Sequence, residues 1–191
     1  VYDNPPKVFI NSKGEPDGIF IDIIKYISAK ENIKIEYQAG EWAALLSKLQ
    51  TGEIDVLPDM AYSDIRKSLY IFSTLPVLGS WLEIFNTKES GIRSILDLTN
   101  KRIGVLRASI QEEFLIDLLA KEPELSFDLV SFDDYAMSVK ALKKQEIDAI
   151  IADRFFYFSE LFDAELLAVG IILRPTELYF AFPKGMNPKL V

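Results

Sequence analysis

The 191-residue chain carries 21 basic and 29 acidic side chains, a net charge of −8, and 49% of its residues are hydrophobic. This length and apolar content are enough for one large or two small globular domains, and the acidic balance disfavours a nucleic-acid partner. The sequence contains neither histidine nor cysteine, which excludes the usual Cys/His zinc sites, thiol nucleophiles and Ser-His-Asp catalysis.

The first half of the chain predicts strands alternating with helices. Apolar residues recur at spacings of three and four in the helices and alternate in the strands, and turn residues separate these elements. The predicted strands are residues 8–10, 33–37, 56–57 and 81–85; the predicted helices are residues 19–30, with Phe20, Ile23, Ile24 and Ile27 on one face, a stretch from Trp42 to a stop at Gly52, and a helix capped by Ser63.

The second half continues this alternation. Its predicted strands are residues 102–106, 127–132, 149–151 and 179–182, and its predicted helices are residues 109–121 and a helix capped by Asp133 that ends at Lys144. Residues 187–191 are expected to begin a further helix, and both ends of the chain are interpreted as trimmed. Alternation of this kind predicts an α/β fold with parallel sheets covered by helices.

One sequence phrase occurs twice. Leu49-Gln-Thr-Gly-Glu-Ile-Asp55 returns 93 residues later as Leu142-Lys-Lys-Gln-Glu-Ile-Asp148, and each copy runs from a predicted helix into a short apolar segment. The spacing exceeds the period of about 20–50 residues that solenoids show. The repeat therefore predicts two α/β lobes, each with a helix, a tight turn and a buried strand in the same order. A cleft between two such lobes is a place where small ligands bind.

Polar side chains follow three predicted strands at their carboxyl ends, where open α/β sheets bind ligands. The first group follows residues 56–57, the second follows residues 102–106 and the third follows residues 149–151. These candidates are Asp59, Tyr62, Ser63 and Arg66 in the first group, Arg107 and Ser109 in the second, and Asp153 in the third.

Each of the three main candidates has two interpretations. Arg66 lies in the first turn of its predicted helix, where the helix dipole disfavours a cation; a bound carboxylate would reverse this cost, but Arg66 could equally be solvated or paired with a nearby acid. Ser109 is a natural helix cap, which is compatible with an anion-binding role. Asp153 caps a helix or holds an ammonium group. An arginine and an aspartate facing each other across a cleft would suit a zwitterion.

Six phrases lie in order along nearly the whole chain, and as a set they resemble the type II periplasmic solute-binding proteins, the family that includes binders of polar amino acids. Each phrase alone is weak, whereas the ordered set is specific. They are Asn4-Pro-Pro-Lys-Val-Phe-Ile10, Gly18-Ile-Phe-Ile-Asp-Ile-Ile24, the first copy of the repeat, Ser63-Asp-Ile-Arg66 leading to Phe72-Ser73, Arg102-Ile-Gly-Val-Leu106 with Ser109-Ile-Gln-Glu112, and Asp148-Ala-Ile-Ile-Ala-Asp153.

The resemblance implies a two-lobed fold joined by two crossover strands, near residues 84–87 and 179–182. Lobe 1 would comprise residues 1–85 and 180–191, and lobe 2 residues 86–179. The resemblance also implies that Arg66 binds the ligand carboxylate, Ser109 its second face and Asp153 its α-amino group. The aromatic residues expected at the mouth of the cleft, where they would stack on the ligand or pack in the core, are Tyr2, Trp42, Tyr62 and Trp81.

Two departures from amino-acid binders point to a subgroup. Arg107-Ala108-Ser109-Ile110 stands where Gly-Thr-Thr is usual, and the loop before Ser63 is one residue shorter. These features are more similar to extracytoplasmic sensor domains that are fused through a membrane helix to a histidine kinase or a diguanylate cyclase. The expectation is a periplasmic sensor domain, tethered to the inner membrane in the full-length protein, that needs no cofactor and captures an amino-acid-like solute.

Two other functions remain open. One is a free binding protein that delivers its solute to the permease of an ABC amino-acid transporter. The other is an enzyme, because this fold family also contains periplasmic dehydratases and Glu41, Asp59 and Asp153 could perform acid–base work. The chain offers no nucleophile–base pair and no metal-ligand set, so a binding domain is favoured over an enzyme.

Overall fold

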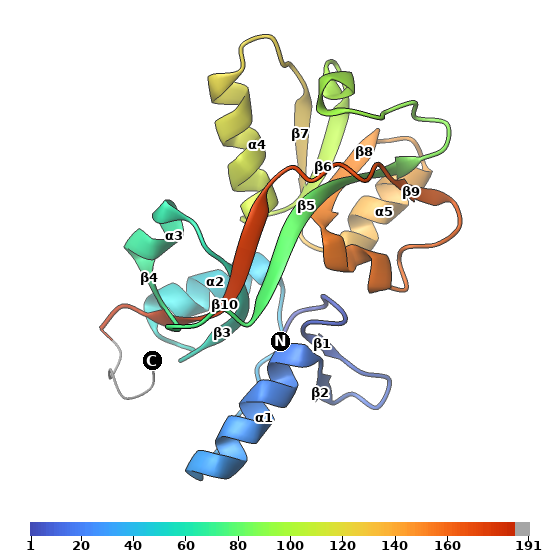
Figure 1. Cartoon of the computed structure of the whole chain (residues 1–191). Coiled ribbons are helices and arrows are strands. Elements are labelled where there is room, and N and C mark those ends of the chain that lie inside the picture. Colours follow the sequence, from blue (N-terminus) through green and yellow to red (C-terminus); the bar gives the residue numbers. More distant parts are fainter. Residues whose placement is uncertain (186–191) are drawn as a thin grey trace. The chain divides into compact units, whose positions relative to one another are not determined.

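A computed structural model describes residues 1–185 of the chain (Figure 1). Its contacts divide the chain into unit 1, Val1–Gly79 with Thr176–Val191, and unit 2, Ser80–Pro175. The chain passes between the units twice, within strand β5 (Leu78–Thr87) and at the start of strand β10 (Pro175–Pro183). These passages come after residues 79 and 175, earlier than the lobe boundaries expected after residues 85 and 179. The helix expected at residues 187–191 lies outside the described residues.

Unit 1 combines a short hairpin, three helices and three paired strands. The hairpin strands β1 and β2 pair with each other, and β10 pairs antiparallel with both β3 and β4. In chain order the elements are β1 (Phe9–Ile10), β2 (Pro16–Asp17), α1 (Ile19–Glu31), α2 (Trp42–Thr51), β3 (Leu57–Ala61), α3 (Asp64–Leu69), β4 (Tyr70–Phe72) and then β10.

The helices of unit 1 follow the apolar spacing of the sequence. Helix α1 buries Phe20, Ile21 and Ile24, and α2 buries Trp42, Leu45 and Leu49. Helix α3 begins where the sequence predicts, because the Ser63 side chain accepts a hydrogen bond from the backbone N–H of Arg66. These three helix predictions are confirmed.

The strand predicted over residues 33–37 is wrong. The segment runs between α1 and α2 without forming a ladder with any described strand, so its alternating apolar pattern is not enough to make it a strand. Ile27, predicted on the buried face of α1, is 43% exposed. It lines a groove beside this same segment, which is why its side chain is not covered.

Unit 2 is a mixed sheet with helices packed on it. Strand β6 lies between β7 and β8 and is parallel to both, while β5 is antiparallel to β8 and β9. Both α4 and α5 pack on β6 (Figure 1). The elements are β5, η1 (Ile95–Leu98), β6 (Arg102–Leu106), α4 (Ile110–Lys121), β7 (Asp128–Phe132), α5 (Tyr135–Lys143), β8 (Ala149–Asp153), η2 (Arg154–Phe158) and β9 (Leu166–Ala168).

The cap of α5 differs from the prediction by one residue. The carboxylate of Asp134 accepts the backbone N–H of Met137 at 2.6 Å, which makes Asp134 the cap. Asp133 instead pairs with the guanidinium of Arg107 at 2.7 Å. Two consecutive aspartates offer the same cap chemistry, and the tertiary ion pair decides between them.

The repeated phrase forms the same turn in both units. Gly52 and Gln145 occupy the same place in the repeat, and both have left-handed backbones, with φ of 76° and 58°. The next residue donates back into the helix in each copy: Glu53 N–H to Lys48 O and Glu146 N–H to Ala141 O, both at 2.9 Å. The repeat therefore marks an equivalent helix–turn–strand unit, α2 to β3 and α5 to β8.

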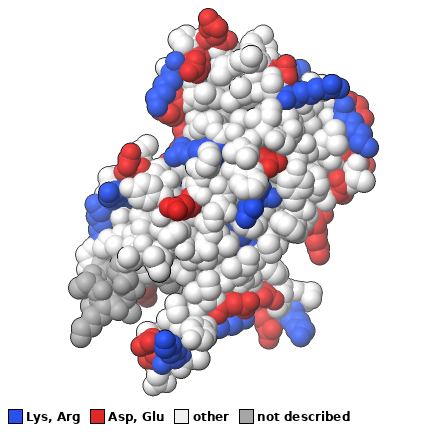
Figure 2. Space-filling view, in the orientation of Figure 1, with Lys and Arg blue, Asp and Glu red and all other residues white. Residues whose placement is uncertain are grey.

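Surface charge is mixed in sign. On the face shown in Figure 2, acidic and basic side chains are interspersed between uncharged areas. Within residues 1–185, the helices are all too short or too polar to cross a membrane.

Candidate functional site

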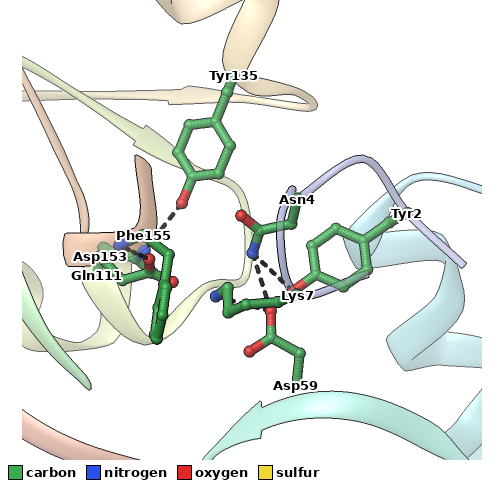
Figure 3. Close-up of polar contacts among 8 residues, drawn as sticks. All are labelled: Tyr2, Asn4, Lys7, Asp59, Gln111, Tyr135, Asp153 and Phe155. Carbon is green, nitrogen blue, oxygen red and sulfur yellow. Dashed lines mark hydrogen bonds and ion pairs between the residues drawn. The ribbon is translucent and has the colours of Figure 1, made fainter. Parts of the chain in front are cut away.

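A buried polar cluster in unit 1 surrounds Asp59 of strand β3. We call it the Asp59 cluster, and it contains Tyr2, Asn4, Lys7 and Asp59 (Figure 3). One carboxylate oxygen, Oδ2, accepts from the Lys7 ammonium at 2.8 Å, the Tyr2 hydroxyl at 2.5 Å and the Asn4 amide at 2.9 Å. The Lys7 and Asp59 side chains are each only 1% exposed. A buried carboxylate of this kind needs a cation and several donors, and this cluster supplies them from the first seven residues.

The cluster fixes the N-terminal segment on β3. Asp59 has a left-handed backbone, with φ of 61°, a conformation that aspartate tolerates better than most residues. Its side chain is thereby held against Lys7, which follows the Pro5–Pro6 dipeptide. Asp59, a predicted ligand-binding residue, is therefore also an anchor for the start of the chain.

Arg66 lies buried in the six-residue helix α3. The residue is 3% exposed, and its guanidinium contacts the Ala61 carbonyl at 3.3 Å and the Met60 sulfur at 3.4 Å. It also lies over the ring of Trp42, 5.7 Å from the ring centroid, and Trp42 packs on Tyr2 at 4.9 Å. Trp42 and Tyr2 are themselves buried, so both aromatic residues belong to the core and to the surroundings of Arg66.

Ser63 and Tyr62 lie at the end of β3 beside Arg66. Ser63 is buried and caps α3, while Tyr62 packs against the rings of Phe72 and Tyr179 at 5.3 and 6.3 Å. The hydrogen bond that the Tyr179 hydroxyl donates to Glu177 raises the pKa of Tyr179 to about 12. The first predicted group thus joins a buried cation, a cap and aromatic faces within unit 1.

The second cluster lies in unit 2, where Ser109 and Asp153 both act as caps. The Ser109 hydroxyl accepts the Glu112 N–H at 3.2 Å, and the Asp153 carboxylate accepts the Phe155 N–H at 2.8 Å. Both residues are buried, with exposures of 3% and 7%. Capping fixes the positions of these side chains and is compatible with a second role toward a ligand.

Gln111 and Tyr135 add neutral hydrogen-bonding groups to unit 2. The Gln111 amide donates to the Tyr135 hydroxyl at 2.9 Å, and both residues are buried (Figure 3). The sequence reasoning missed them because each lies on the apolar stripe of a helix, where only the tertiary fold shows that a polar group has a partner. It missed Asn4 and Lys7 for a related reason: their partner Asp59 is more than fifty residues away along the chain.

Arg107, another predicted ligand-binding residue, is on the surface of unit 2. Its Nε donates to Asp133 at 2.7 Å and its terminal nitrogen to the Ser131 carbonyl at 3.3 Å. The hydrogen bond with Asp133 raises the pKa of Arg107 above its ordinary value. The residue is exposed, which distinguishes it from the buried Arg66 of unit 1.

Trp81 stands beside a buried carboxylate in β5. Its indole N–H donates to Glu83, which is 5% exposed, and the Arg154 guanidinium lies 4.5 Å from the Trp81 ring centroid. Burial, together with the negative charge of Glu83, raises the pKa of the nearby Tyr157 hydroxyl. Glu83 is a further polar residue that the sequence reasoning missed, because residues 81–85 were predicted only as an extended strand.

The buried polar residues of the two units include the guanidinium of Arg66, carboxylates, hydroxyls, two amides and aromatic faces. Groups of these kinds can orient a small polar ligand. Among residues 1–185 there is no group of three or more acidic side chains that could hold a metal ion.

Comparison with known proteins identifies the family of the chain. The model of the bacterial extracellular solute-binding proteins, family 3, matches residues 1–114, and a second model, described as NMT1/THI5 like, matches residues 78–177. The arginine-binding extracellular protein ArtP of Bacillus subtilis is 30% identical over 137 residues, which are 71% of this chain and 52% of ArtP. The chain thus spans about half the length of the curated relatives that it matches.

Solved structures give the fold. An ancestral arginine-binding protein bound to arginine is 28% identical with a TM-score of 0.84, covering 97% of this chain and 82% of the other. A histidine kinase sensor domain with similarity to periplasmic binding proteins is 22% identical with a TM-score of 0.84, covering 98% and 81%. The fold is therefore the two-lobed type II periplasmic-binding-protein fold expected from the sequence. The chain belongs to the bacterial extracellular solute-binding proteins, family 3.

Proposed function

We propose that this chain is an extracytoplasmic sensor domain that captures an α-amino acid between its two lobes and signals by lobe closure. The observation that carries the proposal is the burial of Arg66, which is only 3% exposed, in helix α3. A buried guanidinium has lost most of its hydration, and a bound carboxylate would offset that cost through a bidentate, charge-assisted contact.

The proposed solute is defined by what the relatives' ligands have in common. The names of the similar proteins include binders of arginine, histidine and cystine, whose side chains differ in size and charge. Their shared chemistry is the α-ammonium and α-carboxylate pair. We assign the carboxylate to Arg66 with support from Ser109, and the ammonium to Asp153.

Lobe closure follows from the division of these residues between the units. Arg66 belongs to unit 1, whereas Ser109 and Asp153 belong to unit 2. A solute that binds one unit first would favour a closed form only through the additional contacts it makes with the other. In the longer protein, this movement would bias a histidine kinase or diguanylate cyclase module beyond a membrane helix.

A titration experiment tests the role of Arg66. Isothermal calorimetry with L-arginine, L-histidine and L-cystine should detect binding of at least one, and Arg66→Ala should weaken it by about 2–5 kcal/mol, the cost of truncating a buried charged contact. Arg93→Ala, which removes an exposed arginine of unit 2, is the matched control and should keep the wild-type affinity. An unchanged affinity in Arg66→Ala would refute the assignment.

A second substitution tests the ammonium contact. Asp153→Asn keeps a residue that can cap η2 but removes the charge. It should weaken binding of the amino acid far more than binding of the matching carboxylic acid without the amine. Equal losses for the two ligands would contradict a role for Asp153 in holding the ammonium.

The alternative is a free binding protein that delivers the amino acid to an ABC permease. It is supported by the similarity to a putative amino-acid ABC transporter-binding protein of Vibrio harveyi. The coding sequence around this chain separates the two proposals. Kinase or cyclase sequence in the same reading frame favours the sensor, while a stop codon beside permease genes favours the transporter.

A further inference from the structure

Two opposite charges flank the Trp81 side chain in unit 2. The guanidinium of Arg154 lies over the face of the indole, 4.5 Å from the ring centroid, and the Glu83 carboxylate accepts a hydrogen bond from the indole N–H. Arg154 also lies 4.6 Å from the centroid of the Phe155 ring. Trp81 therefore holds in place an acid from β5 and a cation from η2.

The two charges do not pair with each other. Within residues 1–185, Arg154 contacts aromatic rings but forms no hydrogen bond and no ion pair. Its Nε and the Oε2 of Glu83 are both buried without a hydrogen-bond partner in this part of the chain. Burial and then the charge of Glu83 raise the pKa of the nearby Tyr157 hydroxyl, yet Oε2 itself receives no donor. Each atom thus lacks an interaction that would offset the loss of its hydration.

The pair is open to solvent on the side of the cation. Trp81 and Arg154 are partly exposed, whereas Glu83 is only 5% exposed. The ring contacts stabilise the charge of the guanidinium, but its N–H groups lie in its plane and need acceptors there. A solute can therefore approach Arg154 from solvent and supply an acceptor.

The pair also lies beside the residue that we assign to the solute ammonium. Strand β8 ends at Asp153, and η2 begins with Arg154. Across the ladder, Asp153 pairs with Leu82, the neighbour of both Trp81 and Glu83 in β5. Because adjacent Cα atoms are about 3.8 Å apart, a solute whose ammonium is held at Asp153 can reach Arg154 with its side chain.

We propose that Arg154 and Glu83 form a subsite for a solute side chain that ends in a neutral carboxamide, as in L-glutamine. The amide carbonyl accepts from the Arg154 guanidinium, and the amide N–H donates to Oε2 of Glu83. This inference rests on the proposed function, because it takes the α-ammonium to be bound at Asp153.

The opposite charges of the subsite disfavour charged side chains. A side-chain carboxylate is attracted by Arg154 but repelled by Glu83, and a side-chain guanidinium is attracted by Glu83 but repelled by Arg154. A carboxamide has no net charge and offers both an acceptor and a donor, so it satisfies both residues. L-Glutamine and L-glutamate have nearly the same shape, and a difference between them therefore reports the charge.

The test is calorimetric titration with L-glutamine, L-glutamate and L-arginine. The wild type should bind L-glutamine at least about tenfold more tightly than the other two. Arg154→Met keeps an apolar side chain against the rings but leaves Glu83 as the only charge, and it should shift the preference toward L-arginine. Glu83→Gln leaves Arg154 as the only charge and should shift the preference toward L-glutamate.

Arg93→Met is the matched control, because it removes an exposed arginine of unit 2, and it should keep the wild-type ranking. Urea unfolding checks that each variant is folded, and Arg154→Met carries the test alone if Glu83→Gln does not fold. Tighter binding of L-glutamate or L-arginine to the wild type would overturn the subsite. Unchanged affinity ratios in Arg154→Met would also overturn it, while the proposed function would stand. If none of the amino acids bound the wild type, both proposals would fail.

Discussion

The two units repeat one helix–turn–strand unit but secure its strand in different ways. In unit 2, β8 lies between β6 and β5, and the nearby ion pair of Arg102 and Asp148 is partly exposed. In unit 1, β3 pairs with β10 on one side, and its Asp59 forms a fully buried ion pair with Lys7. The repeat therefore determines the turn, whereas the neighbours of the strand determine what holds it in place.

The different neighbours of β3 and β8 indicate which substitutions should destabilise each unit most. A strand inside a sheet shares its stabilisation among many backbone hydrogen bonds and apolar contacts. In a buried ion pair, much of the stabilisation depends on two side chains, because removing one partner leaves the other charge in a medium of low polarity. A single substitution in unit 1 should therefore lower the free energy of unfolding most at Lys7. Substitutions at the repeated turn and at Asp148 should have smaller effects.

The largest expected effect is that of Lys7→Met. This change removes the cation beside the buried Asp59 carboxylate while keeping a side chain of similar length, and it should lower the free energy of unfolding by about 3–5 kcal/mol. Urea unfolding at pH 7 measures the loss. Lys121→Met, which breaks the exposed pair with Asp117 in unit 2, is the control and should have no measurable effect.

A double substitution separates the ion pair from simple packing. Lys7→Met combined with Asp59→Asn removes both charges, and asparagine tolerates the left-handed backbone at position 59. The double variant should be more stable than Lys7→Met alone. If Asp59→Asn instead lowers the free energy of unfolding further, the unpaired charge of Asp59 is not what destabilises Lys7→Met.

The sequence predicts local elements of this fold well, because their causes are local. The apolar spacing of α1 and α2, the cap at Ser63 and the turn at Gly52 all act within a few residues of one another. The segment 33–37 fails for the opposite reason. Its alternation is that of a strand, but a strand exists only with a partner, and no described strand pairs with it.

The candidate site divides along the same line. The polar residues at the ends of β3 and β8 are visible in the sequence because strand ends can be located. The burial of Arg66 and the surface ion pair of Arg107 with Asp133 cannot be predicted in this way. Both depend on contacts between segments that are far apart in the chain. The anchoring role of Lys7 could not be predicted, because its partner Asp59 follows only after two intervening helices.

An exchange of the two turn residues is expected to have an intermediate effect. A left-handed backbone costs most residues about 1–2 kcal/mol relative to glycine. Gly52→Gln should therefore destabilise the protein by about 1 kcal/mol, and Gln145→Gly should stabilise it by up to a similar amount, since φ is positive at both positions. Gln145→Ala keeps the strained backbone and is the control. Equal urea midpoints for all these variants would show that the two turns are not under the same constraint.

The smallest expected effect is a pH dependence at the end of the second copy. Burial alone would raise the pKa of Asp148, but hydrogen bonds from Arg102 outweigh it, and the pKa lies below its ordinary value of 3.8. The ionised form is thus favoured by folding, so its contribution is complete well above the ordinary pKa of 3.8 and is lost as the pH falls through the lowered pKa. The urea midpoints of the wild type and Asp148→Asn should therefore differ most near neutral pH and converge as the pH falls through the lowered pKa of Asp148. Asp55→Asn changes the exposed counterpart in unit 1 and serves as the matched control. A difference for Asp148→Asn that stays constant across this range would mean that the carboxylate acts through its shape and hydrogen bonds, with no contribution from its charge.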